Sequence, residues 1–209
     1  YYIFVIPYYI PLYYFKNMCR DLVKATGYNV YSDAGYRSYA TQEELYNKFP
    51  DSASLPGKSD HNTGYGINLA VYKDSRVYSL GYNNQTCTAI LAWINANAHK
   101  YGFVRRFDPK KKAYTGMAAG QDDWHYRYVG EAHAYYMAIN NLCLEEYLAL
   151  LEKSYVYGKN SLKFTTDSGN KYEIFYMSQD NVSAVTAPAG KTIEISGNNY
   201  NGFIVTIKG

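Results

Sequence analysis

The chain has 209 residues, of which 21 are basic and 18 acidic, and its formal net charge is +3 at neutral pH. This length fits one domain of about 150 residues with a sizeable core, plus a small appendage. The weak positive charge excludes the strongly basic surface typical of nucleic-acid-binding proteins, so we expect no nucleic-acid partner. The same charge is compatible with an anionic cell-wall environment.

Tyrosine and cysteine are the two informative residue types in the composition. Tyrosine contributes 27 residues. Its flat apolar ring with a polar tip suits stacking on sugars or lining a peptide groove, although a compositional habit of the source organism explains the excess equally well. The cysteines Cys19, Cys87 and Cys143 contain no Cys-x-x-Cys pair and do not form a disulfide framework. We expect buried free thiols, with one bridge as the alternative.

The first 15 residues form an apolar run that two prolines interrupt. The run is too short and too broken for a transmembrane helix, and no basic region precedes it as in a signal peptide. We therefore expect no transmembrane segment. We interpret the run as the start of a trimmed mature domain, in which an extended segment packs on the core.

Helices and short strands alternate over the next part of the chain. Apolar spacing predicts a helix over 15–26 that ends at Gly27, a strand over 28–32, and a second helix that begins at Thr41 as its cap. Residues 50–60 are expected to form a loop. Further strands are expected over 67–72, 103–107 and 124–128, and helices over 86–101, 129–142 and 144–153, with a possible kink at Asn140-Asn141. The pattern predicts an α+β unit over residues 1–153.

Beyond Lys153 the pattern changes to the alternation typical of strands. Four such runs, over 162–165, 171–176, 192–195 and 203–207, are separated by turn-forming sequences rich in Gly, Asn, Ser and Pro. We predict a small all-β module over residues 154–209. A module of about 55 residues is marginal alone, so we expect it to dock on the first unit. A packing role is favoured, and wall anchoring or glycan binding is the alternative.

Two separated sequences carry a candidate metal site. The first runs Ser59-Asp-His-Asn-Thr-Gly-Tyr-Gly-Ile-Asn68, and the second, about fifty-seven residues later, runs Asp122-Asp-Trp-His125-Tyr-Arg127. His61 precedes the short oxygen-bearing Asn68 by seven residues, and Asp122 precedes His125 by three. Two imidazoles, a third ligand and a carboxylate base are the groups needed to activate water on zinc.

The order Ser-x-His-x-x-Gly followed by an acid and a histidine resembles the VanY-type D-alanyl-D-alanine carboxypeptidases of the LAS group of zinc metallopeptidases. Further strings agree over roughly residues 15 to 150: Ser32-Asp-Ala-Gly-Tyr-Arg37-Ser38 with Gln42, Pro56-Gly57, Trp93 with Tyr101-Gly-Phe103 and Arg106, and Trp124-His-Tyr-Arg-Tyr-Val-Gly130. The resemblance implies an α+β fold with a central antiparallel sheet flanked by helices. It also implies a bacterial extracellular or cell-envelope location.

The resemblance implies a role for each matching residue. His61, Asn68 and His125 would bind zinc, and Asp122 would be the general base. Arg37 would receive the terminal carboxylate of a peptidoglycan stem peptide. In the remaining positions, Ser59 would hydrogen-bond the peptide, Gln42 would support the pocket, and Trp124 and Arg127 would either position His125 or only pack. We expect a monomer.

Two positions depart from the family pattern, in which the second ligand is aspartate and the base is glutamate. The neutral amide of Asn68 is expected to weaken zinc binding. The shorter Asp122 places its carboxylate roughly 1 to 1.5 Å farther from a bound water unless the backbone shifts, which weakens a base. The sequence thus predicts a zinc-dependent D-Ala-D-Ala carboxypeptidase-like enzyme. The alternative is a catalytically impaired pseudo-peptidase that binds cell-wall peptide or glycan.

Overall fold

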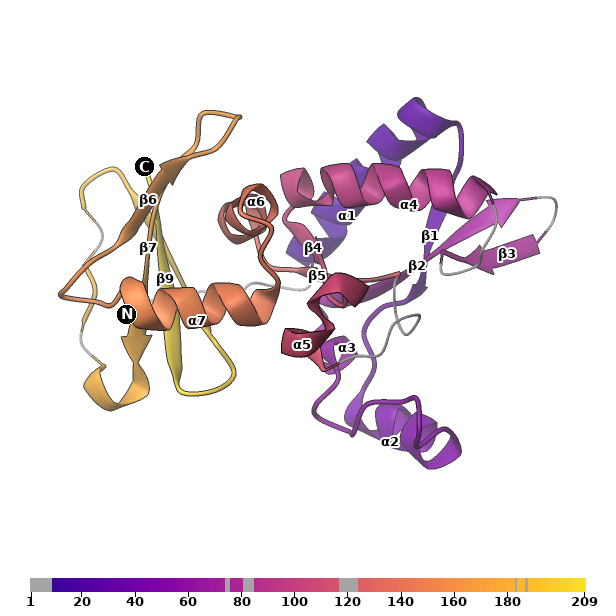
Figure 1. The fold of residues 1–209 in the computed structure, drawn as a ribbon, viewed down its shortest axis with the longest axis horizontal. Helices are drawn as coiled ribbons and strands as arrows, with labels where there is room; N and C mark the ends of the chain where they lie inside the picture. The colour runs from indigo at the N-terminus through magenta and orange to yellow at the C-terminus, as the bar shows by residue number, and fades with distance from the viewer. Residues whose placement is uncertain (1–8, 74–75, 81–84, 117–123, 183, 187) are drawn as a thin grey trace. The chain divides into compact units, whose positions relative to one another are not determined.

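The fold is described from a computed structural model covering residues 9–73, 76–80, 85–116, 124–182, 184–186 and 188–209. The chain divides into two compact units, one spanning Tyr8–Cys143 and the other containing Leu144–Gly209. Both units appear in Figure 1, the first in indigo to red and the second in orange to yellow. Each is described by itself.

The sheet of the first unit has five antiparallel strands. They are β1 (Val30–Ala34), β2 (Gly66–Lys73), β3 (Arg76–Ser79), β4 (Phe103–Arg105) and β5 (His125–Tyr128). The order is β1-β2-β5-β4, and β3 forms a hairpin with β2. Sequence analysis predicted four of these strands and missed β3. The prediction of mixed helices with a central antiparallel sheet is confirmed.

One face of this sheet packs in an apolar core. The strands contribute buried side chains such as Leu69, Phe103 and Tyr126. Buried residues also come from two long helices, α1 (Tyr9–Thr26) and α4 (Gln85–Asn97). The Tyr126 hydroxyl donates to the Asn95 side chain of α4 over 2.6 Å, so its buried polar tip is satisfied. The core therefore anchors β5, the strand that carries a predicted ligand.

Shorter elements complete the first unit. They are α2 (Tyr39–Lys48), α3 (Asp60–Thr63), η1 (Ala98–Tyr101), η2 (Pro109–Lys111), α5 (Lys112–Thr115) and α6 (Glu131–Ile139). The predicted helix over 86–101 is thus an α-helix that tightens into the 3₁₀ turn η1. The predicted bend at Asn140-Asn141 is a full break between helices, and Asn141 has a positive φ of 51°.

Two predictions about helix starts are wrong. The N-terminal apolar run is helical from Tyr9 onward. Pro11 is compatible with this helix because it lies in the first turn, where a backbone N–H has no intrahelical acceptor. Residues 1–8 lie outside the described residues. The second helix begins at Tyr39 with Ser38, not Thr41, as its cap, because the Ser38 Oγ accepts from the Thr41 backbone N–H over 3.1 Å. Sequence analysis also missed α3 and α5.

The second unit contains one helix and a four-stranded sheet. The helix is α7 (Leu144–Ser154), and the strands are β6 (Leu162–Thr165), β7 (Lys171–Ser178), β8 (Thr192–Gly197) and β9 (Gly202–Lys208), with the turn η3 (Gln179–Asn181) after β7. The strand order is β6-β7-β9-β8, all antiparallel. Because α7 contacts β7, the unit begins at Leu144, ten residues before the predicted boundary, and it includes a helix.

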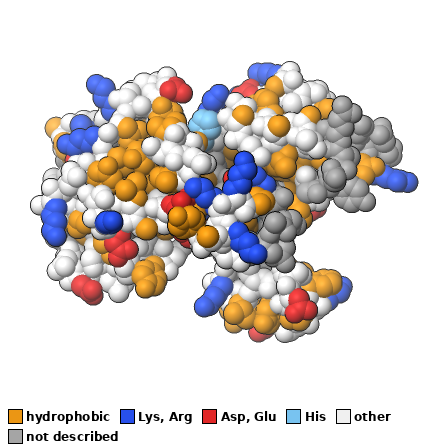
Figure 2. Space-filling model, viewed as in Figure 1, with side chains coloured by type: hydrophobic (Ala, Val, Ile, Leu, Met, Phe, Trp, Pro, Cys, Tyr) orange, Lys and Arg blue, Asp and Glu red, His pale blue; other side chains and the backbone are white. Residues whose placement is uncertain are grey.

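The state of the cysteines, the character of the helices and the surface side chains bear on the expectations from composition. The prediction of free thiols is confirmed: Cys87 and Cys143 are buried, and Cys19 is half-buried, which raises its pKa to about 12. In the described part of the chain, no helix has both the length and the apolar character needed to cross a membrane. Figure 2 shows hydrophobic side chains, a class that includes tyrosine, interspersed with charged ones on the surface of both units.

Candidate metal and peptide site

Strand pairing brings two of the predicted ligands together. In the antiparallel pair β2 and β5, Asn68 lies directly opposite His125, and Gly66 lies opposite Arg127. Because alternate residues share a face, these four positions lie on one face, while Ile67 and Tyr126 lie on the other. The Asn68 Oδ1 is 2.6 Å from the His125 Nδ1. Residues 57 positions apart are thus neighbours because of sheet register.

The third predicted ligand, His61, comes from the short helix α3. Ser59 caps this helix by accepting from the His61 backbone N–H, and Gly64 ends it in the left-handed conformation at a φ of 76°. The His61 Nδ1 is 2.7 Å from the Gly35 carbonyl oxygen. Since a carbonyl only accepts, Nδ1 carries the proton and Nε2 keeps its lone pair. The rings of His61 and His125 are 4.9 Å apart between centroids.

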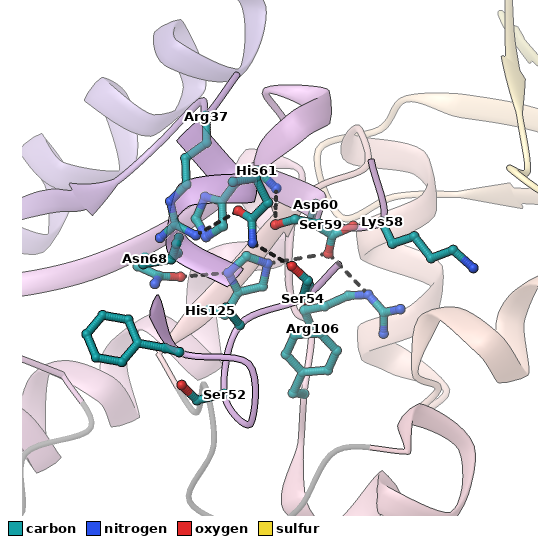
Figure 3. A pocket seen from close by; sticks show the side chains of 15 residues that line it. Arg37, Ser52, Ser54, Lys58, Ser59, Asp60, His61, Asn68, Arg106 and His125 are labelled. Carbon is teal, nitrogen blue, oxygen red and sulfur yellow. Dashed lines mark hydrogen bonds and ion pairs between the residues drawn. The ribbon is translucent and has the colours of Figure 1, made fainter. Parts of the chain in front are cut away.

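These side chains line a pocket of about 200 Å³ that lies entirely within the first unit. Figure 3 shows His61, Asn68 and His125 gathered in its interior, with Arg37 beside them and Lys58 extending away. The loop from Phe49 to Ser54 forms another part of the lining. None of the described residues that line the pocket is a tyrosine, so the tyrosine excess is not explained by this groove.

Arg37 and Gln42 form a linked pair on the pocket wall. The Gln42 side chain is only 1% exposed, accepts from the Arg37 Nη1 over 3.3 Å, and donates to the Ser54 carbonyl over 2.8 Å. The Arg37 backbone N–H also donates to the His61 carbonyl over 3.0 Å. Gln42 therefore joins the guanidinium to the 50–54 loop, and the planar fork of Arg37 suits a carboxylate ligand.

Asp60 lies behind His125. Its Oδ2 is 3.3 Å from the His125 Nε2, and its carboxylate forms ion pairs with Arg106 and Arg127. Burial alone would raise the pKa of the Asp60 carboxyl, but the His125 hydrogen bond and the charges of Arg127 and Arg106 hold it well below its ordinary range. The carboxylate is therefore ionised, and the His125 Nε2 must carry a proton to face it.

Phe107 restricts His125 from another direction. Its ring stacks on the imidazole with centroids 5.5 Å apart and an interplanar angle of 23°. The Arg106 guanidinium lies over the Phe107 ring, 4.8 Å from its centroid. The ring plane of His125 is thus set by an aromatic contact as well as by hydrogen bonds.

Electrostatics keep His61 neutral. Burial, together with the neighbouring charges of His125 and Arg37, lowers the pKa of His61 to about 4, against the opposing effect of the Gly35 hydrogen bond. Near neutral pH the ring is uncharged, and its Nε2 lone pair is available to a metal ion.

The arrangement fits a metal ion. The His125 Nδ1 and the Asn68 Oδ1 are so close that a cation must lie between them, either a proton on Nδ1 that the amide oxygen accepts or a metal ion that both atoms ligate. Two imidazoles and an amide oxygen are ligands compatible with zinc. Among the described residues no group of three His, Cys, Asp or Glu could hold a metal, which follows here because the third position is an amide.

The other predicted residues take different positions. Asp122 lies outside the described residues. Arg127 forms an ion pair with Asp60, the residue that contacts His125. The Trp124 carbonyl accepts from the Leu69 backbone N–H over 3.3 Å, which ties the start of β5 to β2.

Sequence reasoning missed Asp60 and Phe107 and gave Arg106 no role. Asp60 stands between Ser59 and His61 in the sequence, where a solvated acid is the ordinary expectation. A weak signal existed, because an acid next to a metal-ligating histidine is a common orienting partner. The identity of its arginine partners depends on sheet register and could not be seen.

Comparisons with known proteins place the chain in a family. The sequence model described as "VanY: D-alanyl-D-alanine carboxypeptidase" matches residues 13–131, more than half of the chain. The chain belongs to the VanY family. The family resemblance predicted from the motifs is therefore confirmed.

Individual members of the family differ in how much of the chain they match. A D-alanyl-D-alanine carboxypeptidase of Enterococcus faecium is 33% identical over 194 residues, which is 92% of this chain and 58% of that protein. The chain therefore spans little more than half of this relative. Among solved structures, the vancomycin resistance D,D-dipeptidase VanXYg, in complex with a D-Ala-D-Ala phosphinate analogue, is 27% identical with a TM-score of 0.78. It covers 95% of this chain and 80% of its own.

A vancomycin resistance D,D-pentapeptidase VanY from a VanB-type cassette, solved with Zn(II), is 25% identical with a TM-score of 0.55. It covers 66% of this chain and 81% of its own. Residues 144–209 make up almost a third of the chain. The match to VanXYg therefore extends well into the second unit, whereas a coverage of 66% is close to the size of the first unit alone.

Proposed function

We propose that the protein is a zinc-dependent carboxypeptidase that removes the C-terminal D-alanine from peptidoglycan stem peptides ending in D-Ala-D-Ala. The observation that carries the proposal is the convergence of His61, Asn68 and His125 in one pocket with Arg37. Relatives of this family are named for D-Ala-D-Ala carboxypeptidase activity, and one neighbour is solved with Zn(II). A bacterial cell-envelope location and a monomeric state belong to the same proposal.

In this proposal His61, Asn68 and His125 hold the zinc ion. When bound, zinc would supply a Lewis acid for the scissile carbonyl and lower the pKa of water. Gly35 fixes the His61 tautomer, so that Nε2 is the donor atom. The neutral amide of Asn68 adds no charge to the ligand set, so the chain holds zinc less tightly than a family member with aspartate at this position.

Arg37 orients the peptide. Its guanidinium binds the free carboxylate of the terminal D-alanine, and Gln42 holds that guanidinium against the 50–54 loop. Ser59 lies in the pocket lining, where its side chain is assigned to the peptide backbone. Asp122 is assigned as the base that takes a proton from water and returns it to the leaving amine. Orientation by Arg37 also excludes substrates that lack a free carboxyl end.

The test is D-alanine release from a stem pentapeptide by the purified protein, with and without added zinc. We expect zinc-dependent release, with a loss of more than about 100-fold in His125→Ala because a ligand is removed. His99→Ala is the matched control, since His99 lies on η1 and not in the pocket lining. It should retain the parent rate.

A second variant tests the role of Asn68. Asn68→Asp restores an anionic ligand, and zinc affinity measured by chelator competition should rise at least about tenfold, or ~1.4 kcal/mol. Peptide binding without any release, in parent and Asn68→Asp alike, would overturn the proposed activity. The pseudo-peptidase alternative predicts that outcome. The named activities of the relatives give that alternative no support.

A further inference from the structure

We propose that Asp60 is the positioning residue of the metal site, which selects the Nε2–H tautomer of His125 and so directs Nδ1 to the metal. The inference rests on the ligand set of the proposed function. It assigns a role to a residue outside the predicted catalytic, metal-binding and substrate-binding residues. Three independent observations support it: the contact to His125, the clamp on the carboxylate, and the space left by Gly66.

The contact fixes which nitrogen of His125 carries the proton. Asp60 Oδ2 is 3.3 Å from Nε2, while Nδ1 faces Asn68 Oδ1 at 2.6 Å. Figure 3 shows this chain of interactions from Asn68 through His125 to Asp60 and Arg106. A carboxylate only accepts hydrogen bonds, so Asp60 keeps a proton on Nε2 and leaves Nδ1 as the nitrogen at which a metal ion can replace a proton. A carboxylate behind a ligating imidazole also raises the basicity of the ligand nitrogen.

The clamp fixes the carboxylate itself. Arg127, on the same face of β5 as His125, pairs with Asp60 Oδ1, and Arg106 Nε lies 3.4 Å from Oδ2. The side chains of Asp60 and Arg106 are each only 16% exposed, and that of Arg127 is 14% exposed. Partial burial limits the competition from water, so the paired groups hold one geometry. Because it is held by two arginines and lies behind the ring, Asp60 is not placed to act as the base.

Gly66 leaves the space that the contact needs. A Cβ at this position would lie 2.8 Å from the Asp60 Cβ and 3.0 Å from the His125 Cε1. Any side chain here would separate the carboxylate from the imidazole. Gly66 in β2 thus contributes to the contact between Asp60 and His125, since it lets α3 approach the strand that carries His125.

The test measures the tautomer and the metal affinity, without substrate. In zinc-free protein, long-range ¹H–¹⁵N correlation spectra report which imidazole nitrogen is protonated. We expect a proton on the His125 Nε2 in the parent, and loss of that proton with Nδ1–H retained in Asp60→Asn. Zinc affinity from chelator competition should fall about 10- to 100-fold in Asp60→Asn. Asp60→Glu should restore at least part of both readouts.

Two further variants keep the test decisive. Arg127→Gln removes one arginine of the clamp but keeps the carboxylate, so it should lower zinc affinity less than Asp60→Asn does. In the double variant the two losses of affinity should not add, because both residues act through the same contact to His125. Asp180→Asn, in η3 of the second unit, is the matched control and should change neither readout. If Asp60→Asn is poorly folded, Arg127→Gln carries the test.

The proposal is overturned if His125 keeps the Nε2–H tautomer and zinc affinity stays within threefold of the parent in Asp60→Asn. The outcome is separate from that of the proposed function. A protein that fails to release D-alanine can still show a His125 tautomer that changes in Asp60→Asn. Conversely, an active enzyme can keep the same His125 tautomer in Asp60→Asn.

Discussion

The two sheets of the molecule differ in what their faces carry. In the first unit, one face of β2 and β5 is apolar and the other bears Gly66, Asn68, His125 and Arg127. In the second unit, β7 and β9 bury apolar side chains on both faces, with Phe175 and Val205 on one and Ile174 and Ile204 on the other. One sheet therefore positions chemistry, while the other mainly provides stability.

Burying charged and polar side chains in the first unit costs free energy. A buried charge must be paired or hydrogen-bonded, because removing one partner leaves the other desolvated. In the first unit this requirement is met by the Asp60 clamp and by the Gln42 bridge. Among the described residues of the second unit, the buried polar side chains other than tyrosines are Thr166 and Thr206, whose hydroxyl groups need much less compensation. Substitutions in the first sheet should thus affect zinc affinity, whereas substitutions in the second should affect mainly stability.

The largest effect is expected for Gly66→Ala. The added methyl would lie 2.9 Å from the Asp60 backbone carbonyl carbon, as well as against the side chains of Asp60 and His125. Zinc affinity should fall by about 100-fold, the upper range for loss of an orienting contact. Overpacking should also lower the free energy of unfolding by about 1–3 kcal/mol. Chelator competition and urea unfolding measure the two effects.

Gly35→Ala is the matched control for that substitution. Its nearest atom to an added Cβ would be the Ser32 Oγ at 3.7 Å, and its carbonyl still accepts from His61. This variant should keep both zinc affinity and stability. Equal losses in the two variants would mean that the close approach at Gly66 is not the cause.

A glycine in the second sheet should give the opposite result. A Cβ at Gly202 would lie 2.4 Å from the Met177 carbonyl oxygen and 2.6 Å from the Tyr176 ring. The Tyr176 hydroxyl donates to the Asn201 carbonyl over 3.1 Å, which limits how far the ring can move. Gly202→Ala should destabilise this sheet by about 1–3 kcal/mol. Faster hydrogen exchange over β7 and β9 would report the loss.

Zinc affinity should stay within twofold of the parent in Gly202→Ala, because the three proposed ligands all lie in the first unit. Gly197→Ala is the control, since an added Cβ there would meet only the Asn199 N–H nitrogen, at 3.9 Å. A fall in zinc affinity with Gly202→Ala would show that the functions of the two sheets are not separable.

Sequence patterns predicted the two sheets unequally. All four strands of the second sheet were found, because runs such as 171–176 and 203–207 have long apolar alternation between clear turns. In the first sheet β3 was missed, since its four residues have no alternation strong enough to mark a strand. Helix α3 was missed for a similar reason. A single turn between Ser59 and Gly64 leaves no periodicity to detect.

The sequence predicted His61, Asn68 and His125 as ligands from motif order, and the structure brings these three side chains together. The contacts that support them were not predicted. The partners of those ligands come from other elements: the Gly35 carbonyl follows β1, Phe107 follows β4, and Asp60 on α3 pairs with Arg127 on β5. Such contacts depend on register and on the approach of α3 to β2. Local sequence carries neither.

The smallest effect is expected for Ser38→Ala, and it sharpens the comparison within the first unit. Ser38 Oγ accepts from the Thr41 backbone N–H and caps α2, the helix that carries Gln42. Loss of an N-cap costs about 1 kcal/mol. Since α2 holds no metal ligand, zinc affinity should not change, whereas KM for the stem pentapeptide should rise about two- to threefold as α2 frays and the Gln42–Arg37 contact weakens.

Ser178→Ala is the corresponding change in the second unit, where Ser178 Oγ accepts from the Asp180 backbone N–H over 3.2 Å at the start of η3. It removes the same kind of hydrogen bond far along the chain from Arg37, and KM should not move. Equal KM in the two variants would mean that α2 does not transmit its stability to the peptide pocket. A rise in Ser38→Ala alone would show that the polar face of the first sheet depends on helix ends as well as on its own strands.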